Sequence, residues 1–124
     1  KPQEHSLATL APILRREDGR IDWNKPAVQI YNRWRGFQPW PGAFTYFRGK
    51  KLSLHAMRIA DRDEFQLPLD VQAGSLTRRG NRLLAACGEG TWLDLLEVQM
   101  EGKRRMPVEA FLNGVSFMPG ERLD

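Results

Sequence analysis

The chain has 124 residues, a length suited to one compact domain with a single core. Hydrophobic residues make up 41% of it, and the apolar stretches are of strand length, so we expect no membrane span. Lysine and arginine outnumber aspartate and glutamate by 19 to 15, a formal charge of +4, and the single cysteine excludes an internal disulfide and favours a reducing compartment.

Residues 1–20 are expected to form a linker and approach segment, because Pro2, Ser6 and Pro12 interrupt any regular element there. The chain begins with Lys1 and has no signal-like apolar segment near its start, as expected of an excised fragment or a processed chain. Residues 21–124 are then expected to form the folded domain.

The first helix is predicted over residues 24–35, with Asn24 as its cap and Pro26 in its first turn. We expect Gly36 to end it in the left-handed conformation. Its apolar residues recur at helical spacing and predict one face lying on a sheet: Ala27, Ile30, Tyr31 and Trp34.

A rigid corner is predicted between this helix and the first strand, because Pro39 and Pro41 forbid a helix there. Phe37 and Trp40 are expected to pack the corner. Exposed aromatics on a barrel can instead stack on bases, but we favour core or corner packing for both Trp23 and Trp40.

Five strands and a short final helix follow in the sequence. Turn signals recur every eight to twelve residues, which favours a mainly β fold, a small antiparallel and partly open barrel resembling the oligonucleotide-binding fold. The strands are expected at 43–47, 51–59, 74–78, 82–87 and 91–100, with a polar loop at 61–70 and a helix at 107–112 ended by Gly114.

Two of these strands carry consecutive apolar residues, at 83–87 and 92–96. They are predicted to be buried on both faces, with a helix or a neighbouring domain covering the outside. Cys87 lies at the end of the first run and is expected to be a buried thiol.

Few residues suit catalysis or metal binding. His5 lies in the linker, and His55 lies within a strand, where we expect a surface or packing residue. No Cys/His pair has metal-ligand spacing, and no local motif suggests a nucleophilic triad. We therefore predict no catalytic, cofactor-binding or metal-binding residue in this chain.

Several short motifs together carry a resemblance to a known family. They are Gly19-Arg20-Ile21-Asp22-Trp23, Phe37-Gln38-Pro39-Trp40-Pro41-Gly42-Ala43, Gly102-Lys103-Arg104-Arg105-Met106, Phe111-Leu112-Asn113-Gly114 and Pro119-Gly120-Glu121-Arg122-Leu123. In this order, from about Leu10 to Leu123, the chain resembles the C-terminal domain of methionyl-tRNA formyltransferase.

The resemblance implies a binding module. A covalently linked N-terminal domain, absent here, would transfer formyl from 10-formyltetrahydrofolate to the methionine of initiator methionyl-tRNA, and this domain would hold the tRNA without a cofactor. Alone it should be inactive. We expect a monomer, with no membrane partner, in the bacterial cytoplasm or an organellar matrix.

Basic residues at turns are the candidates for holding the RNA backbone, because phosphate contacts come chiefly from lysine and arginine. Each has the alternative of a solvated surface charge, and Arg35 has the further alternative of binding helix-end carbonyls or Asp22. The candidates are Arg16, Arg20, Arg35, Lys50, Lys51, Lys103, Arg104 and Arg105.

Two other functions remain open. The chain resembles the C-terminal domains of other formyl-folate enzymes, such as formyltetrahydrofolate dehydrogenase and sugar formyltransferases. There it would be a structural domain with no nucleic-acid role, docking through its apolar outer strands. A free-standing nucleic-acid binder fits a barrel but not the tether-like start of the chain.

Overall fold

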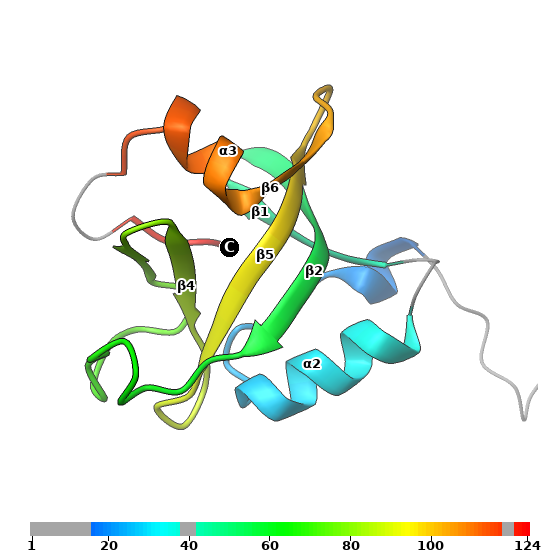
Figure 1. The fold of residues 1–124 in the computed structure, drawn as a ribbon. Coiled ribbons are helices and arrows are strands. Elements are labelled where there is room, and N and C mark those ends of the chain that lie inside the picture. Colours follow the sequence, from blue (N-terminus) through cyan, green and yellow to red (C-terminus); the bar gives the residue numbers. More distant parts are fainter. Residues whose placement is uncertain (1–15, 38–41, 118–120) are drawn as a thin grey trace, which may run out of the picture.

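The structure is a computed structural model that describes residues 16–37, 42–117 and 121–124, and it is mainly β (Figure 1). Its core is a six-stranded antiparallel sheet with strand order β1-β2-β5-β4-β3, and β6 pairs with β5 beyond that path. The fold-class prediction is confirmed. Expectations for residues 1–15 and for Pro39, Trp40 and Pro41 lie outside the described residues, and a linker ending at residue 20 stays a prediction.

All five predicted strands and both predicted helices are present. Most of their first and last residues differ from the predicted ones by one or two positions. The elements are η1 (Arg16–Gly19), α2 (Ala27–Gly36), β1 (Ala43–Phe47), β2 (Lys50–Ile59), β3 (Leu76–Arg79), β4 (Arg82–Ala86), β5 (Trp92–Met100), β6 (Arg105–Pro107) and α3 (Val108–Gly114). In the described ranges, no helix combines the length and apolarity needed to cross a membrane.

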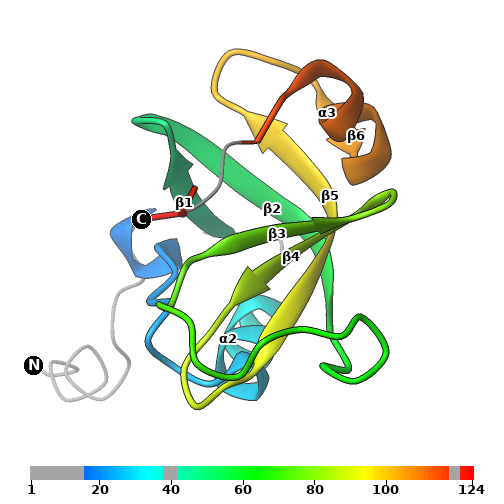
Figure 2. The same cartoon turned by 90° about the vertical axis from the view of Figure 1, so that its left-hand side faces the viewer.

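The sheet is strongly coiled but does not close on itself (Figure 2). The last residues of the chain lie between its two edges, β1 and β3. Leu123 N donates to Gly74 O at 2.8 Å, and Asp124 N donates to Tyr46 O at 3.0 Å. Leu123 forms an antiparallel bridge with Phe47 and is only 1% exposed. The partly open barrel expected from the turn spacing is thus an open sheet whose gap is bridged by this segment.

Helix α2 confirms the predicted apolar face but not its predicted ends. Ala27 and Ile30 are buried in the main hydrophobic core, and Tyr31 and Trp34 pack against that core. Asn24 does not cap the helix, because the N-cap is Pro26, and the hydroxyl of Thr91 accepts from Ala27 N at 2.8 Å. A side chain 64 positions away thus satisfies a free N–H at the helix start, which no local pattern indicates.

The left-handed glycines lie elsewhere than expected. Gly36 is the last residue of α2 and is not among the described residues with positive φ. The C-cap is the next residue, Phe37, whose N–H donates to the carbonyls of Arg33 and Trp34. Positive φ occurs instead at Gly49, with Arg48, in the turn between β1 and β2 (φ 79° and 54°), which is the pattern of a type I′ hairpin.

The outer side of β4 and β5 forms a second, smaller apolar cluster. As predicted, residues 83–87 are buried throughout. Their outer side is covered by the loop after β2 rather than by a helix or a neighbouring domain. Leu67 and Phe65 pack there beside Trp92, whose indole N–H donates to Pro68 O at 3.1 Å. The polar loop at 61–70 carries these apolar side chains inward, so the chain covers its own sheet.

Strand β6 was not predicted, because it is only three residues long and its first residue, Arg105, ends a basic run. It pairs with the far half of β5, where Gln99 lies opposite Arg105. Helix α3 follows directly, and Val108, Phe111 and Leu112 are buried on its inner side.

The bridging segment yields a prediction on stability. Replacing Leu123 with alanine should lower the free energy of unfolding by roughly 2–5 kcal/mol, because it removes a buried side chain between the sheet edges. Urea denaturation measures the change. Arg122→Ala, at the exposed neighbouring position, keeps the same backbone hydrogen bonds and should cost well under 1 kcal/mol. Equal losses in both variants would contradict the role given to Leu123.

Candidate nucleic-acid interface

Strand β1 places two aromatic rings on the outside of the sheet, each covered by a cation. Phe44 and Tyr46 alternate with Thr45, whose side chain faces the core, so they share the outer face, where Phe44 is buried under its neighbours and Tyr46 is half-buried. Their rings meet edge to face at 5.9 Å. The Arg20 guanidinium lies 4.9 Å from the Tyr46 ring centre, and Lys51 Nζ lies 4.6 Å from that of Phe44. Cation–π contacts thus hold two of the predicted cations on one surface.

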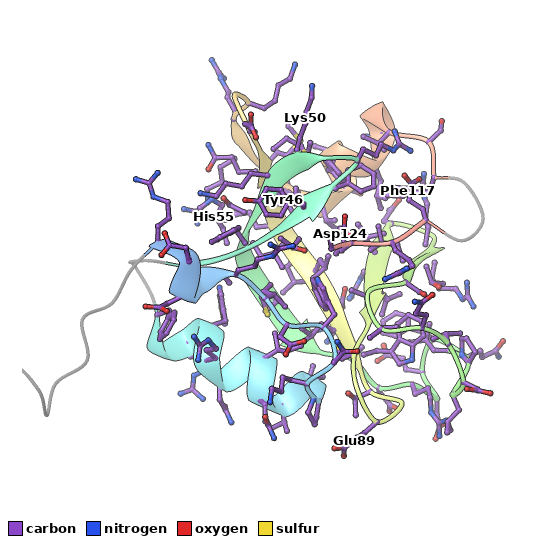
Figure 3. All side chains as sticks on the ribbon, turned by 180° about the vertical axis from the view of Figure 1, so that it is seen from behind. Tyr46, Lys50, His55, Glu89, Phe117 and Asp124 are labelled. Atoms are coloured by element: carbon purple, nitrogen blue, oxygen red, sulfur yellow. The ribbon has the colours of Figure 1, made fainter. Side chains whose placement is uncertain are left out.

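The hairpin between β5 and β6 brings a second group of cations to the same end of the sheet. Glu101 N donates to Lys51 O at 2.8 Å, and Lys51 N donates to the Glu101 carboxylate at 3.1 Å. This pair joins the β1–β2 hairpin to the β5–β6 hairpin. Figure 3 shows Lys50 and Tyr46 on this side of the molecule. We call this surface the basic face; its cations are Arg20, Lys51, Lys103, Arg104 and Arg105. Lys50 lies at its edge, because it is paired with core residue Phe47 and alternates with Lys51.

Uncharged polar side chains occupy the middle of the basic face. His55 Nε2 lies 2.8 Å from Gln99 Oε1, and Gln99 Nε2 donates to Lys103 O at 3.0 Å. Ser53 lies opposite Gln99 in the β2–β5 register. His55 is half-buried and labelled in Figure 3, and it is a surface residue, as expected from its place in the strand.

Arg16 and Arg35 border the basic face rather than belonging to it. Both are exposed, on η1 and in the last turn of α2, and Arg33 Nη2 joins these two elements by donating to Asp18 O at 2.9 Å. The Arg35 guanidinium lies 5.8 Å from the ring centre of Tyr31. Asp22 is exposed and accepts from Asn24 N, so it is not the buried partner considered for Arg35.

Other arginines hold the protein together. Arg48 binds Glu121 through two hydrogen bonds of 2.6 and 2.8 Å, which raise the pKa of Arg48. Arg79 donates to the carbonyls of Phe65 and Gln66 and so fastens the covering loop. Of the eight predicted cations, Arg105 alone forms an ion pair with another described residue, Glu97 at 2.5 Å.

Asp94 is the charged residue that sequence reasoning missed. It is fully buried, and its Oδ2 accepts from Arg58 Nε at 2.8 Å and from Arg82 Nη1. The hydrogen bond to Asp94 raises the pKa of Arg58. The signal was a single carboxylate within the apolar run Trp92–Leu96, since a buried charge needs partners on adjacent strands. These arginines therefore stabilise the sheet.

The described residues include no group of three or more histidine, cysteine or acidic side chains placed to hold a metal ion. Cys87 is buried, as predicted, and burial raises the pKa of its thiol to about 12. What the surface offers is charge, hydrogen bonding and aromatic contact.

Comparison with protein families matches residues 13–116 to the family described as "Formyl transferase, C-terminal domain". The chain belongs to this family. The resemblance inferred from the motifs is therefore confirmed, over a match that includes η1, all six strands and α3.

Similar curated proteins carry the name methionyl-tRNA formyltransferase. That of Acidobacterium capsulatum is 53% identical over 121 residues, which are 98% of this chain and 37% of the relative. That of Koribacter versatilis is 49% identical over 113 residues, 91% of this chain and 34% of the relative. That of Geobacter sulfurreducens is 40% identical over 122 residues, which are 98% of this chain and 36% of the relative. The formyl transferase C-terminal domain described here thus spans little more than a third of these relatives.

The raised pKa of Cys87 yields a prediction on reactivity. At pH 8 a thiol with a pKa of about 12 is ionised to only about 10⁻⁴, so iodoacetamide should leave Cys87 of the folded domain unmodified. In urea the same thiol should react within minutes to hours. Because the folded-state pKa is raised, the neutral thiol favours folding at low pH, and stability should fall as pH rises from about 9 toward 12. Rapid modification of the folded chain, followed by mass spectrometry, would show that the thiol is accessible.

Proposed function

We propose that this domain holds initiator methionyl-tRNA while an N-terminal domain, outside this chain, transfers formyl from 10-formyltetrahydrofolate to the methionine amino group. The family match and the names of the relatives support the parent enzyme. The observation that carries the RNA-binding role is the convergence of two hairpins and η1 on the basic face. No described residue receives a catalytic role, and the domain is proposed to act as a monomer linked to its catalytic partner.

The charges of the basic face suit an RNA backbone. Lys103 and Arg104 are exposed and form no ion pair with another described residue, so they can neutralise phosphates without first breaking a protein contact. Each phosphate neutralised releases condensed counterions and makes binding weaken with salt. Such contacts fix the position of the RNA but do not read its sequence. The domain is therefore proposed to hold tRNA, while choice of the initiator belongs to the rest of the enzyme.

Arg20 and Lys51 add pre-ordered charge to this surface. Their contacts with Tyr46 and Phe44 restrict long side chains before any ligand arrives. Ordering a flexible side chain on binding costs about 0.5–1.5 kcal/mol, so pre-ordering favours affinity. Trp23, the alternative base-stacking residue, is buried and donates from its indole N–H to the Thr45 hydroxyl at 2.9 Å, so it takes no part.

The alternative, a docking domain of another formyl-folate enzyme, relied on apolar outer strands as the docking face. Phe65 and Leu67 of the chain's own loop cover those strands. The surface that motivated the alternative is therefore occupied, which favours the tRNA enzyme. The relatives named above come from bacteria, which favours the bacterial cytoplasm over an organellar matrix as the place of action.

The β5–β6 hairpin provides the test. Replacing Lys103 and Arg104 together with alanine should weaken binding of initiator tRNA at low salt and flatten the slope of log K against log salt by about one to two units. Arg105 is left in place because its loss would free the Glu97 carboxylate. Fluorescence anisotropy over a salt series measures both quantities.

A charge-matched control comes from the opposite end of the molecule. Lys25 and Arg62 lie beside the start of α2 and in the loop after β2, far from the hairpin in Figure 1. Changing both to alanine removes the same charge and should leave the slope nearly unchanged. Equal effects of the two double variants would show that net charge, rather than the basic face, governs binding. Absence of tRNA binding by the unaltered chain at low salt would refute the proposed function.

A further inference from the structure

The centre of the basic face is polar but uncharged. Ser53, His55 and Gln99 are all half-buried there, on the paired strands β2 and β5. Cations stand on both sides: Lys51 precedes Ser53 by two residues on β2, and Lys103 is joined to Gln99 by a hydrogen bond. An RNA backbone whose phosphates reach both cations would pass over this centre.

The hydrogen-bond network determines which nitrogen of His55 carries hydrogen. Gln99 Nε2 donates to Lys103 O, so the other amide atom, the acceptor Oε1, is the one that faces His55 Nε2 at 2.8 Å. An oxygen acceptor requires an N–H opposite it. Nε2 is therefore the protonated nitrogen of the neutral ring, and Nδ1 carries a lone pair.

This lone pair is open to an incoming group. Among the described residues, none forms a hydrogen bond with His55 Nδ1, and the sole buried side-chain polar atom without a partner is Oδ1 of Asp94. Nδ1 therefore reaches the surface of the molecule. It offers an acceptor among cations, and the neighbouring carboxylates, Glu101 and Glu97, already accept from Lys51 N and from Arg105.

We propose that His55 binds a ribose 2′-hydroxyl through Nδ1, on a nucleotide whose adjacent phosphates contact Lys51 and Lys103. A phosphate oxygen has no hydrogen to give to this acceptor, whereas the 2′-hydroxyl is a donor and is the group by which proteins distinguish RNA from DNA. The inference rests on the proposed function and extends it. Cations alone bind either nucleic acid, and His55 makes the basic face selective for RNA.

Deoxy-interference mapping tests this contact. Initiator tRNA carrying sparse, random 2′-deoxy phosphorothioate nucleotides is bound to the whole chain at pH 8 and low salt, and the bound and free pools are cleaved and compared. With the unaltered chain, deoxy substitution at one or two positions should lower binding about fivefold, the loss of one hydrogen bond. His55→Phe keeps the ring volume but has no acceptor, so interference at those positions should disappear while the rest of the profile stays.

Lys103→Ala is the matched control, because it removes a cation but keeps the backbone carbonyl that accepts from Gln99 Nε2, so Gln99 still faces His55 and Nδ1 stays an acceptor. It should weaken binding of all tRNA molecules alike and retain the interference. If His55→Phe shows the same interference profile as the unaltered chain, or if no deoxy position affects binding, the inference is wrong and the proposed function stands. If the unaltered chain does not bind tRNA at low salt, both fall.

Discussion

The hydrogen bonds of the last residues, Glu121–Asp124, hold together the two edges of an open sheet. Leu123 fills the gap from the inside, and Asp124 binds both the backbone of Tyr46 and the hydroxyl of Thr45. Because Thr45 is directed inward and held there, Phe44 and Tyr46 must point outward on the same strand. The surface that carries the cations of the basic face therefore depends on a contact made on the opposite side of β1.

The arginines of this domain divide into two classes by their partners. Arg48, Arg58 and Arg82 bind carboxylates that are buried or half-buried, and Arg79 binds backbone carbonyls of the covering loop. A buried carboxylate without such partners would be costly, so these cations are not available to a ligand. Arg20 and Lys51 rest on aromatic rings, which orders them without neutralising their charge. In this formyl transferase C-terminal domain, some cations therefore stay available at the surface, while others are bound within the protein and stabilise it.

Much of the fold followed from local patterns. An apolar run placed β1, and the apolar stripe of α2 followed from the helical spacing of its residues. The errors arose where distant residues supplied the decisive contact. Thr91 satisfies the helix start in place of Asn24, and the 61–70 loop covers β4 in place of a helix or another domain. Strand β6 was not predicted from the sequence, because three residues form a strand only when a neighbouring strand, here β5, extends far enough to pair with them.

The candidate site shows the same division. Motif order alone identified the family, whereas the choice of basic residues at turns as phosphate contacts stays a prediction. Which of them share a face was decided by tertiary structure, because strands far apart in sequence meet through register and coiling. The pairing of Lys51 with Glu101, and of His55 with Gln99, crosses more than 40 positions of chain. A sequence pattern indicates which residues share a face of one helix or strand. How one element is oriented against another depends on the packing of side chains between them, and this packing exists only in the folded chain.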